Sequence, residues 1–137
     1  MRTVVLVTLT VFAFANLDGH VSIGHLQGGR NMDSLRGKTL RWTFTDGPVA
    51  GTLFEHTFQD DGSLVWRVLE GQGKGASAQE KRYATMQVAD DVHTVSYLAA
   101  SGHTLTVVLS LASGRMCAFA SNNTEWYPLS GTFEVVQ

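Results

Sequence analysis

From Lys38 to the end of the chain, short segments alternate apolar and polar residues, and turn-forming residues separate them. An alternation of period two places successive side chains on opposite faces of a β-strand. The breaks, such as Asp60-Asp-Gly62 and Ser113-Gly114, carry the residue types that tight turns require. No segment has a helical stripe of useful length. The pattern therefore predicts strands over residues 38–45, 52–59, 63–69, 82–89, 92–99, 103–111, 115–121 and 131–136.

Eight strands joined mostly by short hairpins predict an all-β fold, an eight-stranded antiparallel up-and-down barrel of lipocalin-like form. Such a sheet removes its exposed edges by closing, and its interior is filled by side chains or holds one small ligand. The Gly-rich segment 71–80 is expected to be a long loop that ends in one helical turn. We expect a single barrel domain over residues 35–137, preceded by an N-terminal extension over residues 1–34.

The N-terminal extension has two interpretations. The apolar run 3–12 followed by Ala13-Phe-Ala15 is typical of a short secretory signal cleaved after Ala15, and it is too short to span a membrane. Alternatively, Met32 is the natural start, because the barrel pattern begins directly after it. The second interpretation predicts a cytoplasmic protein, which we favour, and the first predicts a secreted or periplasmic one.

Charge and cysteine content narrow the function classes. The formal net charge is -2, and Lys and Arg residues are scattered, so nucleic-acid binding is not expected. The lone Cys117 excludes a disulfide framework and a thiolate zinc site. It lies in the apolar run 116–120, where we expect a buried thiol. No metal and no cofactor is expected.

The alternation also assigns the faces of the strands. The polar face carries residues such as Arg41, Glu55 and Arg67. The expected inward face carries Leu40, Trp42, Phe44, Phe54, His56, Phe58, Leu64, Trp66, Val68, Met86, Val88, His93, Val95, Tyr97, Leu105, Val107, Leu109, Leu111, Phe133 and Val135.

Three polar side chains, His56, His93 and Tyr97, fall on this apolar face. A buried polar group without a partner costs roughly 1–3 kcal/mol, so these groups either satisfy one another in a filled barrel or orient a ligand in a cavity. Tyr83, after the long loop, is a candidate for the rim. The predicted ligand-binding residues are Trp42, Phe44, Phe54, His56, Phe58, Trp66, Tyr83, His93 and Tyr97.

The segments 36–47, 64–68 and 91–97 resemble the small calycin-type barrels of the MoaF-like family and, more distantly, the bacterial phenolic acid decarboxylases. The resemblance extends over about residues 35–137 and implies a β-barrel but no established chemistry. In the decarboxylases two tyrosines of the first strand hold the substrate carboxylate, and here the matching positions look like Trp42 and Phe44. The decarboxylase glutamate is matched by Ala99. The resemblance therefore does not carry decarboxylation to this chain.

Three functions remain open at this point. The first is a barrel that binds a small, largely apolar or aromatic molecule in its interior. The second is a cofactor-independent lyase, isomerase or cyclase in which His56, His93 or Tyr97 acts as the general acid or base. The third is an interaction module with a solid barrel whose outer face or edge forms a homodimer.

Overall fold

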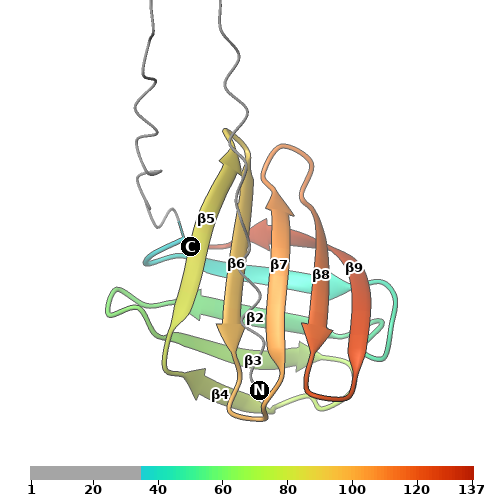
Figure 1. Cartoon of the computed structure of the whole chain (residues 1–137). Coiled ribbons are helices and arrows are strands. Elements are labelled where there is room, and N and C mark those ends of the chain that lie inside the picture. Colours follow the sequence, from blue (N-terminus) through green and yellow to red (C-terminus); the bar gives the residue numbers. More distant parts are fainter. Residues whose placement is uncertain (1–34) are drawn as a thin grey trace, which may run out of the picture.

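The structure is a computed structural model that describes residues 35–137. This part of the chain contains nine strands and no helix (Figure 1). The strands are β1 (Thr39–Phe44), β2 (Leu53–Phe58), β3 (Leu64–Glu70), β4 (Ser77–Glu80), β5 (Tyr83–Ala89), β6 (Val92–Leu98), β7 (Thr104–Ser110), β8 (Arg115–Ser121) and β9 (Trp126–Val135).

All nine strands belong to one antiparallel sheet with the order β4-β3-β2-β1-β9-β8-β7-β6-β5. Strands that follow one another in the chain pair with each other, except that β4 does not pair with β5. The first strand, β1, also pairs with the last strand, β9. The sheet curls into a half-barrel in which β1–β4 run crosswise behind β5–β9 (Figure 1). We call the place where the edges of β4 and β5 remain unpaired the seam.

The predicted all-β antiparallel meander is confirmed, with nine strands in place of eight. The additional strand, β4, lies in the segment that was expected to be a loop with a helical turn, and that expectation is wrong. Its Ser, Ala, Gln and Glu have little β-propensity, but the free edge of β3 offers backbone hydrogen bonds from Leu64 to Arg67. The last strand begins at Trp126, whereas it was predicted to begin at residue 131. The prediction began too late because Pro128 lacks an N–H and obscures the strand pattern in this part of the sequence.

The interior is formed by the predicted inward face of β1–β3, β6 and β7. Trp42, Phe58, Leu64, Val107 and Leu109 have no exposed surface. Their complete burial gives this face the largest share of the hydrophobic stabilisation, about 1.5–3 kcal/mol for each large apolar side chain.

The predicted faces are wrong on β5. Met86 and Val88 are 63% and 68% exposed, and the register pairs Tyr83 with Tyr97 and Thr85 with Val95. The odd-numbered residues of β5 therefore face inward, whereas the even-numbered residues were predicted to do so. A shift of one residue moves every side chain of a strand to the opposite face.

Three further residues expected inside are exposed. Cys117 is exposed because it alternates with the buried Met116 and Ala118 on β8. Leu111 and Val135 are 43% and 47% exposed, since Leu111 follows the end of β7 and Val135 is the last residue of β9.

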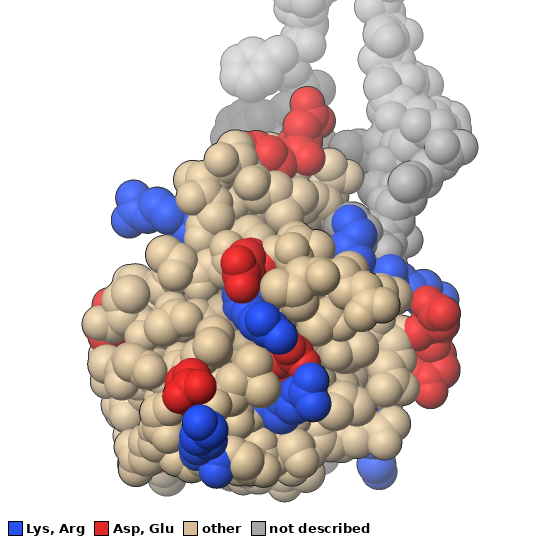
Figure 2. Space-filling model, turned by 180° about the vertical axis from the view of Figure 1, so that it is seen from behind, with Lys and Arg blue, Asp and Glu red and all other residues tan. Residues whose placement is uncertain are grey.

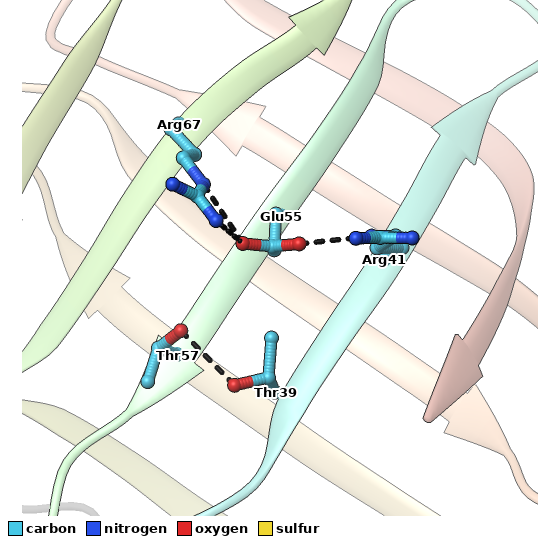
Figure 3. A network of polar contacts seen from close by, with 5 residues as sticks. All are labelled: Thr39, Arg41, Glu55, Thr57 and Arg67. Atoms are coloured by element: carbon cyan, nitrogen blue, oxygen red, sulfur yellow. Dashed lines mark hydrogen bonds and ion pairs between the residues drawn. The ribbon is translucent and has the colours of Figure 1, made fainter. Parts of the chain in front are cut away.

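The outer face of β1–β3 is organised by one carboxylate between two guanidinium groups (Figure 3). Glu55, which is 5% exposed, lies in register between Arg41 and Arg67. Arg41 Nε donates to Glu55 Oε2 and Arg67 Nε donates to Oε1, each over 2.8 Å. Burial alone would raise the pKa of Glu55, but the hydrogen bonds and charges of the two arginines outweigh it and lower that pKa.

The N-terminal extension, with the two candidate starts at Met1 and Met32 and the cleavage site after Ala15, lies outside the described residues. Among residues 35–137, no helix has the length and apolarity that crossing a bilayer requires.

Candidate ligand-binding site

The aromatic residues predicted to line a pocket pack mainly against one another. The rings of Trp42 on β1 and His56 on β2 lie 3.8 Å apart between centroids. Phe54 makes edge contacts with Phe44 at 5.7 Å and with Trp66 at 6.3 Å. These strands are adjacent, so side chains on their shared inward face meet across the ladder. The inward face of β1–β3 is therefore a continuous aromatic cluster.

One hydrogen bond crosses the interior from this cluster to the opposite half of the sheet. His56 Nε2 on β2 and Tyr97 Oη on β6 are hydrogen-bonded over 3.0 Å. His56 is 1% exposed and Tyr97 is 8% exposed. Two of the three polar groups expected on the apolar face thus satisfy each other. His56 Nδ1 and the indole nitrogen of Trp42 are buried and have no hydrogen-bond partner among the described residues.

Burial keeps the His56–Tyr97 pair neutral. Loss of hydration lowers the pKa of His56 well below its ordinary value, because the imidazolium form would be charged in an apolar interior. Burial, with a smaller contribution from the negative charge of Glu80, raises the pKa of Tyr97. At neutral pH the pair is therefore a neutral imidazole and a neutral phenol joined by one hydrogen bond.

Glu80, on β4, connects the two sides of the seam. No pattern in the sequence identified it as a site residue. Its Oε1 accepts from Trp66 Nε1 of β3 over 3.0 Å, and its Oε2 accepts from the backbone N–H of Ala100, just beyond β6, over 2.9 Å. The side chain is only 3% exposed. No motif surrounds Glu80 in the sequence, and its role depends on how β3 and the segment that follows β6 lie against β4.

A groove with a volume of about 950 Å³ lies at the seam. Glu80, Tyr83, Ala84, Tyr97 and Ala99 are among the residues that form it, and Lys81 and Arg82 of the β4–β5 connection contribute to its rim. A volume near this size is enough for a small organic ligand. The groove thus combines apolar surface with a few polar groups.

The structure divides the predicted site residues between the groove and the core. Tyr83 and Tyr97 line the groove, and Tyr83 packs against Phe58 at 4.9 Å between ring centroids. His56 lies behind Tyr97 in the interior, with Trp42, Phe44 and Phe54 around it. Trp66 is tied to the groove wall through Glu80.

His93 is the third polar residue of the predicted site. It is buried, 4% exposed, and lies on β6 in register with Gln87 and Leu109. It does not line the groove. Within residues 35–137, no three His, Cys, Asp or Glu side chains are grouped so that they could hold a metal ion.

Two of three comparisons with known proteins agree with this architecture. A search of curated proteins finds no match. Among solved structures, the chain resembles the crystal structure of "a putative beta-lactamase from Burkholderia vietnamiensis", with a TM-score of 0.65 and 19% identity over 75% of this chain and 96% of that chain. At this identity the likeness concerns the fold alone. The profile of the MoaF N-terminal domain matches residues 28–125, and the chain therefore belongs to the MoaF family.

Proposed function

We propose that this protein binds a small, largely apolar or aromatic molecule at the seam groove. The observation that carries the proposal is the position of Tyr97, which lines the groove and is also hydrogen-bonded to His56. The hydrogen bond to His56 fixes the orientation of the Tyr97 phenol. A polar group of a ligand that reaches Tyr97 would therefore be oriented by it. A largely apolar site with a few fixed polar groups is the usual composition of a small-molecule pocket.

The aromatic cluster supports this site from the interior. Tyr83 is held by its edge contact with Phe58, and Trp66 by its hydrogen bond to Glu80. Groups whose geometry is fixed before binding lose less conformational entropy when a ligand arrives. Trp42, Phe44, Phe54 and His56 thus support the groove, and ligand contacts would be made by Tyr83, Tyr97 and Glu80.

Catalysis by a lyase, isomerase or cyclase is the second candidate, and the His56–Tyr97 hydrogen bond is the observation that favours it. A proton could pass from a ligand to Tyr97 while Tyr97 passes its own proton to His56. Against this route, the lowered pKa of His56 makes it a weaker base and the raised pKa of Tyr97 makes it a weaker acid. Binding without chemistry is therefore the better supported function.

Fluorescence titration tests the proposal. Trp66 is hydrogen-bonded to the groove residue Glu80, and Trp126 is exposed elsewhere. The chain has three tryptophans, so a Trp126→Phe protein reports only on Trp42 and Trp66. Small neutral and anionic aromatics that are not excited at wavelengths selective for tryptophan, such as toluene, phenol and benzoate, are titrated into this protein. We expect saturable changes that weaken at least about tenfold in a Tyr83→Ala variant, which removes groove surface.

The control is Tyr127→Ala, since Tyr127 is partly buried and does not line the groove. Absence of saturable binding across the panel, or equal binding by Tyr83→Ala and the parent, would refute the groove as the site. For the catalytic alternative, a His56→Gln variant that keeps the fold and full turnover of any substrate found would remove His56 as acid or base.

A further inference from the structure

Two ring nitrogens in the interior have no hydrogen-bond partner within residues 35–137. They are Nε1 of Trp42, which is fully buried, and Nδ1 of His56, which is 1% exposed. The two rings are neighbours, with 3.8 Å between their centroids. Trp42 Nε1 is always a donor, whereas His56 Nδ1 is a donor or an acceptor according to which ring nitrogen carries the proton. The position of that proton therefore decides what kind of group is left unpaired in the core.

One of the two positions is the less favourable. With the proton on Nδ1, His56 and Trp42 present two unpaired N–H donors on neighbouring rings in an apolar interior. Buried N–H groups without an acceptor are rare in proteins. With the proton on Nε2, Nδ1 presents a lone pair, whose partial charge is opposite in sign to that of the indole N–H. The second tautomer thus leaves one unpaired donor in the core in place of two.

The tautomer sets the direction of the hydrogen bond between His56 and Tyr97. His56 Nε2 and Tyr97 Oη lie 3.0 Å apart. With the proton on Nε2, His56 donates and the phenol oxygen accepts, so the phenol hydrogen is free to reach another acceptor. Tyr97 lines the groove, and this hydrogen is therefore available there. A proton relay from Tyr97 to His56 needs the opposite tautomer, which is a further argument for binding without chemistry.

The charges around the groove favour a neutral acceptor. On the outer face of β1–β3, basic and acidic side chains lie side by side and compensate one another (Figure 2). The charged residues that form the groove are Glu80, Lys81 and Arg82. Burial and, to a smaller degree, the negative charge of the buried Glu80 raise the pKa of Tyr97, so the same charge would repel an anion bound there. Lys81 and Arg82 are exposed, and water and salt screen their attraction for an anion.

We propose that His56 carries its proton on Nε2, that Tyr97 consequently donates its hydrogen into the groove, and that the ligand accepts it with a neutral carbonyl oxygen. This inference rests on the seam groove being the ligand-binding site. A carbonyl oxygen accepts without adding a donor that would need a partner of its own. The apolar part of the ligand would contact Ala84, Leu98 and Ala99, which also form the groove. The expected ligands are small apolar ketones, aldehydes and esters, and His56 is a positioning residue for Tyr97.

Nuclear magnetic resonance of the full chain tests the tautomer without a ligand. Long-range correlation of ring hydrogens and nitrogens at pH 7.5 shows which nitrogen of a histidine is protonated. The His56 ring is assigned through nuclear Overhauser contacts with Trp42 and Tyr97. We expect the proton on Nε2. A proton on Nδ1 would overturn the inference, whatever the protein binds.

Three probes of similar size test the ligand class by titration of the isotope-labelled protein. Acetophenone has a neutral carbonyl, α-methylstyrene has a methylene group in place of the oxygen, and benzoate has a carboxylate. Tyr97→Phe should weaken acetophenone about tenfold, because it removes the donor, and should change α-methylstyrene by less than about twofold. This comparison cancels the difference in hydrophobicity between the two probes. Benzoate should bind the parent at least about tenfold more weakly than acetophenone does.

Tyr127→Phe is the matched control, because it removes a phenol oxygen from a residue that does not line the groove. It should bind all three probes as the parent does, and far-ultraviolet circular dichroism should show that both variants are folded. Equal effects of Tyr97→Phe on the two neutral probes, or benzoate that binds as tightly as acetophenone, would overturn the ligand class and leave the groove as the site. Failure of all three probes to bind the parent would refute the groove and the ligand class together.

Discussion

Glu80→Gln tests the physical basis of the seam. In the native protein one carboxylate accepts from Trp66 Nε1 and from the backbone N–H of Ala100. The substitution changes little volume, but a carboxamide has only one acceptor oxygen. Its NH2 group must face one of the two N–H donors, and that donor loses its partner.

The magnitude follows from this exchange. A hydrogen bond to a charged group contributes about 1.5–3 kcal/mol, and a neutral one about 1 kcal/mol. One bond is lost and the other is weakened, while a neutral side chain costs less to bury than a charged one. We expect the free energy of unfolding to fall by about 2 kcal/mol, which is a large part of the stability of a small domain.

Urea denaturation followed by tryptophan fluorescence measures this change, through the midpoint and the slope. Glu70→Gln is the matched control, because Glu70 pairs with Lys74 over 3.5 Å while both side chains are more than half exposed, 64% and 66%. That control should change the free energy by less than about 0.5 kcal/mol. If Glu80→Gln and Glu70→Gln have the same small effect, the carboxylate does not hold the seam together.

Two further predictions concern stability. Because the pKa of His56 is lowered in the folded protein, protonation favours the unfolded chain, and stability should fall as the pH drops below about 6.5, by up to roughly 1.4 kcal/mol per pH unit. Urea midpoints between pH 7.5 and 5 measure this loss, which should be reduced in His56→Gln; an equal slope in both proteins would contradict it. Gly131→Ala should destabilise by about 1–3 kcal/mol, since a Cβ there would collide with the Thr43 carbonyl and lie 2.7 Å from Met116 Cε. Thermal denaturation measures this change, with Ser130→Ala at an exposed position as the control. An unchanged midpoint for Gly131→Ala would show that β1 and β9 separate easily and would contradict the expected collision.

Much of the fold could be predicted from the chain because the information is local. Alternation of Trp42 and Phe44 with Arg41 and Thr43 identifies a strand and both of its faces. The same reasoning failed on β5, where Ala84-Thr-Met-Gln-Val-Ala89 contains no charged residue to identify the wet face. Burial of Tyr83 and exposure of Met86 are decided by the pairing of β5 with β6.

The candidate site, like the fold, could be predicted from the sequence only in part. The sequence by itself determined that His56 and Tyr97 lie on the apolar face of their strands, because side-chain direction follows from strand period. It could not determine that His56 and Tyr97 bond to each other, since they are 41 residues apart and meet only when the sheet curls. The seam groove and the role of Glu80 likewise depend on which two strands remain unpaired. Local alternation fixes which way a side chain points, whereas its partner is decided by long-range pairing, which no local pattern encodes.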